Sequence, residues 1–247
     1  MYIWLYKILM MSYGKESEIS NSLRELKLFQ IKQTFSLFIS AYYNLEQAAF
    51  TKLVKATSII SFKYKIIGGL NPNEQEEVYN SAALNIIKNK QFNLAELKAI
   101  YVEYENFETD FSNKIFKNTS RNHQIAKYIF RKIEIYKFRN DIPAESDLYS
   151  IEHILPENAT ENWGAFTNDA MERCKYRFGN LTLLEKKSNK DAGIKKYEEK
   201  KQFYKASNSK LTNILPDQYG DWTEENIVVR QKDLAKDAKS IWRLQFN

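Results

Sequence analysis

A small set of residues in the C-terminal half carries the side chains that hydrolysis of a phosphodiester bond requires. Glu152 and His153 are adjacent in "YSIEHILPEN", Asn180 opens "NLTLL", and Asn189 lies in "KKSNKDAG". A neutral imidazole can act as a general base because its pKa lies near the working pH. Carboxylate and amide oxygens are ligands that Mg²⁺ prefers, and a bound cation neutralises charge on a transferring phosphate. These residues are therefore candidates for one hydrolytic site.

Each candidate also has a purely structural interpretation. Glu152 could be a solvated strand residue, His153 a hydrogen-bonded core residue, and Asn180 a turn residue. Asn189 could cap a helix. Neighbours on a regular strand point to opposite faces, so Glu152 and His153 can serve one site only if the strand ends or twists there. Pro156 favours such an end, because proline rarely continues a strand ladder.

A run of lysines follows the candidate site. Residues 186 to 210 contain nine lysines and three acidic residues. A solvated helix face is the usual interpretation of such a run, but beside a hydrolytic site it could also follow a phosphate backbone. On the second interpretation the nucleic-acid-binding residues are Lys187, Lys190, Lys195, Lys196 and Lys200.

The secondary structure that must position these residues is predicted to differ between the first and second halves of the chain. From about residue 16 to 136 the pattern is helical. One apolar stripe runs from Ile19 to Phe38 and predicts a helix, and the glycines of "IIGGLNPNEQEE" predict a stop before the next one. Asn93 is a candidate N-cap, and His123 lies at the start of a further helix. The aromatic stripes of this region are expected to be core.

From residue 139 onward the pattern predicts a strand, a long loop, a second strand, a turn and a helix. The strands are centred on "LYSIEHIL" and "NLTLL", the turn is "KKSNKDAG", and the helix is "IKKYEEKKQFYKAS". The segment after "DWTEEN" predicts a last amphipathic helix that Thr223 caps. No internal repeat is present.

Composition narrows the class of protein. The 247 residues carry a formal charge of +6, which is compatible with a nucleic-acid partner and does not by itself establish one. A single cysteine excludes an internal disulfide framework, and a reducing cytoplasm is the expected compartment. The apolar start "MYIWLYKILMMSYGKE" is too short to span a bilayer and is expected to be core, with no membrane partner.

The order "EHILP", "GNLTLL" and then an Asn before a Lys-rich helix resembles the HNH, or ββα-metal, endonuclease superfamily. Within it, the chain is similar to the C-terminal nuclease domain of GmrSD-type, modification-dependent restriction enzymes. The resemblance includes "YIFRKIE", "YEEKKQFYKAS" and "DWTEENIVVRQKDLAKDAKSIW", and covers roughly residues 122 to 242.

The resemblance implies a role for each candidate. His153 matches the general base, and Glu152 the acidic metal ligand before it. Asn180 matches the middle asparagine, which fixes the loop through backbone hydrogen bonds, and Asn189 the last metal ligand. Because that last position is Asn and not His, an oxygen-only site for Mg²⁺ or Mn²⁺ is expected. The relatives also carry an N-terminal sensor domain with a DGQQR-like stretch that this sequence lacks, so the chain would be half of a split system or a truncated reading frame.

The expected fold is mainly α with a small α+β insert, a helical bundle that carries an embedded ββα-metal unit. Residues 1–146 would form a helical domain that docks a sensor partner, and residues 147–247 the nuclease domain. The expected function is metal-dependent cleavage of DNA, modified or unmodified, in bacterial defence, leaving 5′-phosphate and 3′-hydroxyl ends. Two alternatives stay open: a DNA-binding or adaptor subunit that is weak in catalysis and needs a separate sensor, and a nuclease for RNA.

Overall fold

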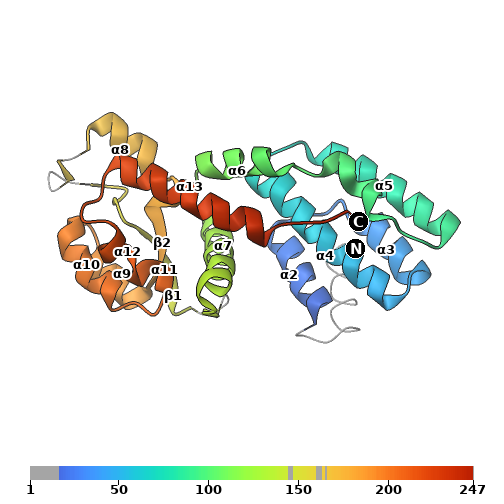
Figure 1. The fold of residues 1–247 in the computed structure, drawn as a ribbon, viewed down its shortest axis with the longest axis horizontal. Coiled ribbons are helices and arrows are strands. Elements are labelled where there is room, and N and C mark those ends of the chain that lie inside the picture. The colour runs from blue at the N-terminus through green and yellow to red at the C-terminus, as the bar shows by residue number, and fades with distance from the viewer. Residues whose placement is uncertain (1–16, 144–146, 160–162, 165, 247) are drawn as a thin grey trace. The chain divides into compact units, whose positions relative to one another are not determined.

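The structure is a computed structural model that describes residues 17–143, 147–159, 163–164 and 166–246. This part of the chain is mainly helical and contains a two-stranded antiparallel sheet (Figure 1), which confirms the predicted balance of helix and strand. Within these residues, no helix combines the length and apolar character that crossing a membrane requires. The apolar start, residues 1–16, for which core packing is predicted, lies outside the described residues.

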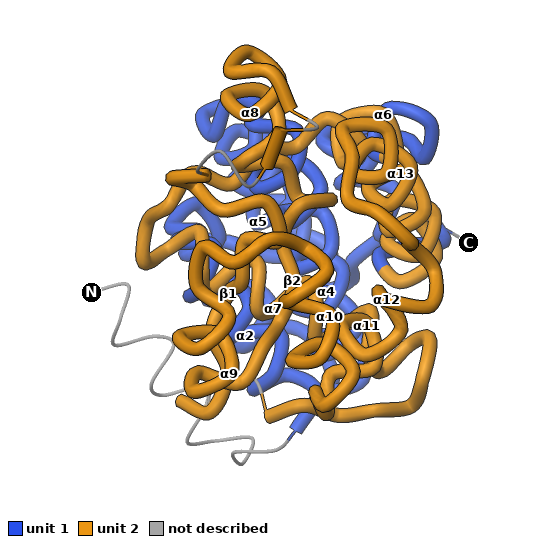
Figure 2. The backbone as a smooth tube through the Cα atoms, turned by 90° about the vertical axis from the view of Figure 1, so that its left-hand side faces the viewer, with its two compact units in different colours: residues 1–107, 242–247 blue, residues 108–241 orange. Residues whose placement is uncertain are grey.

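The chain divides into two compact units, shown in different colours in Figure 2: residues 1–107 with 242–247, and residues 108–241. The sequence predicted a division after residue 146. The division lies earlier because helix α7 (Ser120–Phe138) contacts both strands of the sheet and the last helix, α13 (Glu224–Ile241). Helix α7 therefore belongs to the unit that carries the candidate residues.

The first unit is helical in its described part. The single helix predicted from residue 19 to 38 is wrong. The chain leaves helical geometry after Leu28, and Gln30 has a φ of 54°, in the left-handed region. The predicted glycine stop is confirmed, since Gly69 has a φ of 64° and Asn71 caps the helix that follows. Asn93 forms the capping box of a 3₁₀ helix. The elements are α2 (Glu18–Leu28), α3 (Phe35–Asn44), α4 (Gln47–Ser61), the π-helix η1 (Phe62–Ile67), α5 (Pro72–Asn89) and η2 (Leu94–Ile100).

The rest of the chain holds α6, α7, the sheet and the helices that follow it. The two strands form where they are predicted, and the oxygen of Thr223 accepts from the Asn226 N–H at the start of α13, as predicted. The turn predicted for residues 186–193 is wrong, because residues 186–192 form helix α9, which ends at Gly193 with a φ of 50°. The elements besides α7 and α13 are α6 (Tyr104–Asn113), β1 (Tyr149–His153), α8 (Asn168–Cys174), η4 (Phe178–Asn180), β2 (Leu181–Glu185), α9 (Lys186–Ala192), α10 (Tyr197–Lys205), α11 (Lys210–Asn213) and α12 (Leu215–Gln218).

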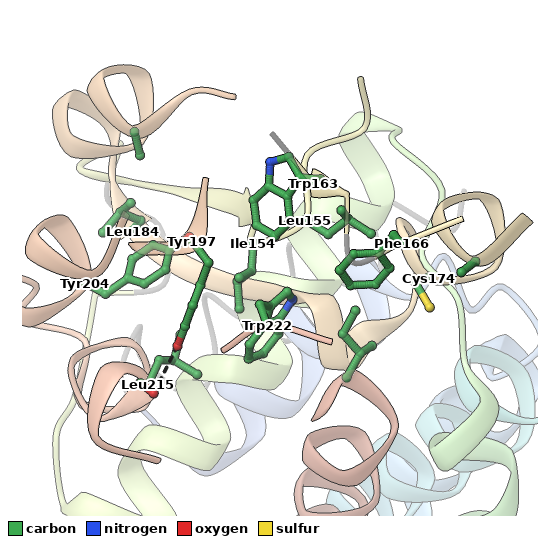
Figure 3. Packing of buried hydrophobic residues seen from close by; sticks show 13 residues of the cluster. Ile154, Leu155, Trp163, Phe166, Cys174, Leu184, Tyr197, Tyr204, Leu215 and Trp222 are labelled. Atoms are coloured by element: carbon green, nitrogen blue, oxygen red, sulfur yellow. Dashed lines mark hydrogen bonds between the residues drawn. The ribbon is translucent and has the colours of Figure 1, made fainter. Parts of the chain in front are cut away.

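The core of the second unit holds the chain directly after β1 (Figure 3). Ile154 and Leu155 are fully buried in a cluster that includes Trp163 and Trp222. Glycine is required at position 179, because a Cβ there would lie 2.1 Å from the carbonyl oxygen of Ile227 in α13. The close approach of α13 and the burial of Ile154 and Leu155 fix the two segments on which the candidate residues lie.

Candidate functional site

The candidate residues are organised around the antiparallel pair of strands. In the register of the sheet, Glu152 lies opposite Thr182 and His153 opposite Leu181. Because β1 is regular up to His153, the side chains of Glu152 and His153 project from opposite faces. The strand ends directly after His153, and the next residues turn into the core. His153 is thus the last residue of an ordered strand.

Asn180 fixes the turn after β1 with both ends of its side-chain amide. Its Oδ1 accepts from the Leu155 N–H at 2.8 Å and from Trp222 Nε1 at 3.0 Å. Its Nδ2 donates to the carbonyl oxygens of Leu155 at 2.8 Å and Lys175 at 3.2 Å, and its own carbonyl accepts from the Ile154 N–H. The loop-fixing contacts expected of Asn180 are present. Because Asn180 is fully buried, it acts on the site by holding the backbone and is out of reach of a substrate.

Glu152 lies in a buried ion pair. Its Oε1 accepts from Lys200 Nζ at 2.7 Å and from the Tyr204 hydroxyl at 2.9 Å. The Lys200 ammonium also donates to the carbonyls of His153 and Ile154, at 3.0 and 3.1 Å. Burial raises the pKa of Glu152 and lowers that of Lys200, and each partner opposes the shift of the other. Since all three ammonium protons have acceptors, we describe the pair as charged.

His153 is largely enclosed and neutral. Its side chain is 12% exposed, its Nε2 lies 3.4 Å from Glu157 Oε1, and its ring meets the Tyr176 ring edge to face at 6.1 Å. Burial lowers the pKa of His153 to about 4; Glu157 opposes this shift, and His123 and Lys200 add to it. The imidazole is therefore unprotonated near neutral pH, as a general base must be, and a pKa below the working pH makes it a weaker base than an unperturbed imidazole.

The low pKa of His153 predicts a loss of stability in acid. Unfolding returns the imidazole to its ordinary pKa of 6.5, so between pH 6.5 and about 4 the unfolded chain binds more protons at His153 than the folded chain does. The free energy of unfolding should then fall as the pH falls through this window, by up to about 1.4 kcal/mol per pH unit. Urea unfolding at about pH 7 and about pH 5 should show a larger loss for the wild type than for His153→Asn. Equal losses would contradict the assignment.

Asn189 lies on α9 and faces β1. Its Nδ2 donates to Ser150 Oγ at 2.9 Å and to the carbonyl oxygen of Ile151 at 3.0 Å. These bonds attach the helix to the strand that carries His153. The amide is half-buried and does not cap α9. The structure thus places Asn189 beside β1 and gives its amide nitrogen a structural role there.

The lysines divide into an exposed group and a buried one. Lys187, Lys190, Lys195 and Lys196 are exposed, which is compatible with contact to a phosphate backbone. The prediction that Lys200 shares such a face is wrong, because its side chain is fully buried and donates to Glu152. A fully buried ammonium cannot reach a nucleic acid without unfolding of α10.

Comparison with known proteins identifies the unit that holds these residues. The family model described as "GmrSD restriction endonucleases, C-terminal domain" matches residues 101–237, more than half of the chain. The chain belongs to this family. A comparison with curated proteins gives no match. The matched range contains all the candidate residues, and it confirms the GmrSD likeness stated from "EHILP" and "GNLTLL".

The GmrSD likeness implies a metal site, and the residues assigned to it do not fit one as they are placed. The Lys200 ammonium lies 2.7 Å from Glu152 Oε1, where a divalent ion bound to that oxygen would have to lie. Among the described residues, no three His, Cys, Asp or Glu side chains converge in a way that could hold a metal ion. The surroundings of Glu152 therefore give its role as a metal ligand no support, and no chemical step is assigned to a metal here.

The sequence analysis did not identify some residues that shape this GmrSD-family site. Lys200 and Tyr204 fix Glu152, and Arg230, buried in α13, donates to the carbonyls of Gly179 and Leu181 at 2.6 Å each. A signal for Lys200 was present, since Tyr197 and Tyr204 lie three residues before and four after it. This spacing places all three on one face of a helix, and that face is the buried one.

Proposed function

We propose that this member of the GmrSD C-terminal family is an endonuclease that hydrolyses phosphodiester bonds in DNA, with His153 as its general base. The observation that supports the proposal best is the state of His153: a neutral imidazole at the end of an ordered strand, in a backbone that Asn180 and Lys200 hold in place. The family supports a nuclease, and the HNH-type chemistry and the DNA substrate are the proposed part.

In the proposed reaction, His153 takes a proton from a water molecule as that water attacks phosphorus. The bond from phosphorus to the 3′ oxygen breaks, that oxygen takes a proton from solvent, and 5′-phosphate and 3′-hydroxyl ends result, as the HNH likeness implies. The exposed lysines around α9 would hold the phosphate backbone without reading bases. As the HNH likeness implies, we also propose that cleavage needs Mg²⁺ or Mn²⁺, which would neutralise charge on the phosphate. Glu152 as it is placed would not hold that ion, so no residue of the chain is assigned to it.

In the cell, the chain would act as the nuclease part of a bacterial defence system in the cytoplasm, together with a sensor subunit. This setting extends the proposal from the restriction endonucleases that give the family its name. The sensor would supply recognition of modified DNA.

The test of the proposal uses the purified chain with modified plasmid, unmodified plasmid and a folded RNA, each with Mg²⁺, Mn²⁺ or EDTA. Cleavage of DNA that EDTA abolishes is the expected result. Binding without cleavage in every condition would favour the DNA-binding or adaptor alternative, and preferential cleavage of RNA would replace DNA as the substrate.

The exposed lysines should determine how DNA binding depends on salt. Changing Lys187, Lys190, Lys195 and Lys196 to Gln should weaken binding to all sequences alike, since backbone contacts carry no base information. The slope of log affinity against log salt should flatten by about 0.9 for each lysine that contacts a phosphate. Fluorescence anisotropy over a range of salt concentrations measures both effects.

A charge-matched control separates contact from net charge. Lys32, Lys52, Lys88 and Lys98 are exposed in the first unit, and their change to Gln removes the same charge. The control should keep the wild-type slope to within the error of the fit. Equal flattening in the variant around α9 and in the control would show that net charge alone acts. An unchanged slope in the variant around α9 would mean that DNA binds at another surface.

A further inference from the structure

One carboxylate beside His153 belongs to no motif. Glu157 lies four residues after His153, beyond the end of β1, and its Oε1 is 3.4 Å from His153 Nε2. That nitrogen is buried and makes no hydrogen bond to any residue that the structure describes. The exposed 12% of the His153 side chain therefore excludes Nε2. Of the two ring nitrogens, Nδ1 is the one left to meet a water molecule.

Glu157 is itself held from two other segments of the unit. Asn118, just before α7, donates from Nδ2 to Glu157 Oε1 at 2.6 Å. The hydroxyl of Tyr176, between α8 and η4, donates to Glu157 Oε2 at 3.4 Å, and its ring lies edge to face against the His153 ring. The Glu157 side chain as a whole is three-quarters enclosed. At 3.4 Å, its carboxylate oxygen Oε1 is the acceptor that lies near a proton on His153 Nε2.

We propose that Glu157 is the positioning residue of His153, accepting the proton on Nε2 and so leaving Nδ1 unprotonated as the atom that takes a proton from water. This inference rests on the proposed function, in which His153 is the general base. A fixed carboxylate on one ring nitrogen selects the tautomer and orientation of an imidazole and stabilises the imidazolium that forms when the other nitrogen is protonated.

A second imidazole faces the same carboxylate. His123, in the first turn of α7, also has a buried Nε2 with no hydrogen-bond partner among the described residues. Burial lowers the pKa of His123, and Glu157 opposes this shift. The charged or titratable groups around His153 are thus Glu157, His123, Tyr176 and the Lys200 ammonium on its carbonyl. Glu157 provides the negative charge in this group.

The experiment exploits the small number of histidines. The chain has two, so in a His123→Gln background every imidazole signal comes from His153. Long-range ¹H–¹⁵N spectra then report which nitrogen of His153 carries the proton. With Glu157 present, the Nε2–H tautomer should dominate. In Glu157→Gln and Glu157→Ala the Nδ1–H form should gain population, because the carboxylate that selects Nε2–H is gone.

Kinetics complete the test in the chain that retains both histidines. Glu157→Gln should lower kcat by about 10- to 100-fold and leave KM nearly unchanged. Glu172→Gln, which removes an exposed carboxylate paired with Lys175, is the matched control and should behave as the wild type. An unchanged tautomer, or an altered tautomer with unchanged kcat, would overturn the inference. A wild type without nuclease activity would overturn the proposed function instead, and the spectra would still show whether Glu157 orients His153.

Discussion

Replacement of His153 by alanine is expected to lower the rate of DNA cleavage by about 10²- to 10⁴-fold, the usual contribution of a general base. The imidazole is the group of this site that is neutral at physiological pH and lies at the end of an ordered strand. DNA affinity should stay close to that of the wild type, because the proposed phosphate contacts come from lysines on and after α9. Single-turnover rates at saturating protein measure the chemical step without binding.

The fold of the His153→Ala protein must be checked alongside its rate. Some stability should be lost near neutral pH, because removal of the enclosed ring leaves a cavity, but the fold should persist, since the backbone carbonyl keeps its bond to Lys200. Circular dichroism and thermal unfolding establish this. A folded His153→Ala protein that cleaves at the wild-type rate would remove His153 from the mechanism.

The buried pair of Glu152 and Lys200 should give the largest effect on stability. Lys200→Met leaves the Glu152 carboxylate buried without its cation and removes the donor to two carbonyls, of His153 and Ile154. Breaking a buried pair by removing one partner costs about 3–5 kcal/mol of unfolding free energy. Urea unfolding of Lys200→Met measures this loss, which should not depend on added Mg²⁺.

Two further variants identify the cause of that loss. Lys201→Met removes a neighbouring cation whose partner, Glu198, is exposed, and should cost about 1 kcal/mol or less. The double variant Glu152→Gln with Lys200→Met should recover part of the stability, because no charge is then left buried without a partner. If Lys200→Met were as stable as Lys201→Met, the claim that Glu152 and Lys200 form a buried, charged pair would be wrong. Mg²⁺ that stabilises the wild type, and not Glu152→Gln, would restore Glu152 as a metal ligand.

Local patterns predicted the parts of this site that depend on neighbours in sequence. The strand at residues 149–153 and the Thr223 cap follow from alternation and cap chemistry, whereas the loop-fixing role of Asn180 is what the HNH resemblance implies. The burial of Lys200 did not follow, because a Lys-rich composition conceals which helix face is covered; the tyrosines on either side carried that information. Glu157 was missed although it lies only four residues after His153, because β1 ends between the two residues and no local pattern shows that the chain brings the carboxylate back to the ring. Its other partner, Asn118, is 39 residues away.

The structure divides after residue 107 and not at the predicted break between residues 146 and 147, for a similar reason. The change from helical periodicity to alternating residues marks where the strands begin. The boundary of a compact unit depends instead on which helices the strands contact. Helix α7 reads like the helices before it, and it packs on β1 and β2. Likewise, Gln30 interrupts an apolar stripe that local periodicity alone would continue.

The most direct measurement of the central claim is cleavage of supercoiled plasmid by the purified chain, followed over time on a gel. The account predicts nicked and then linear DNA with Mg²⁺ or Mn²⁺, no product with EDTA, and a rate for His153→Ala that is lower by about 10²-fold or more. Failure of the folded wild type to cut DNA with either ion would contradict the account, as would equal cutting by wild type and His153→Ala.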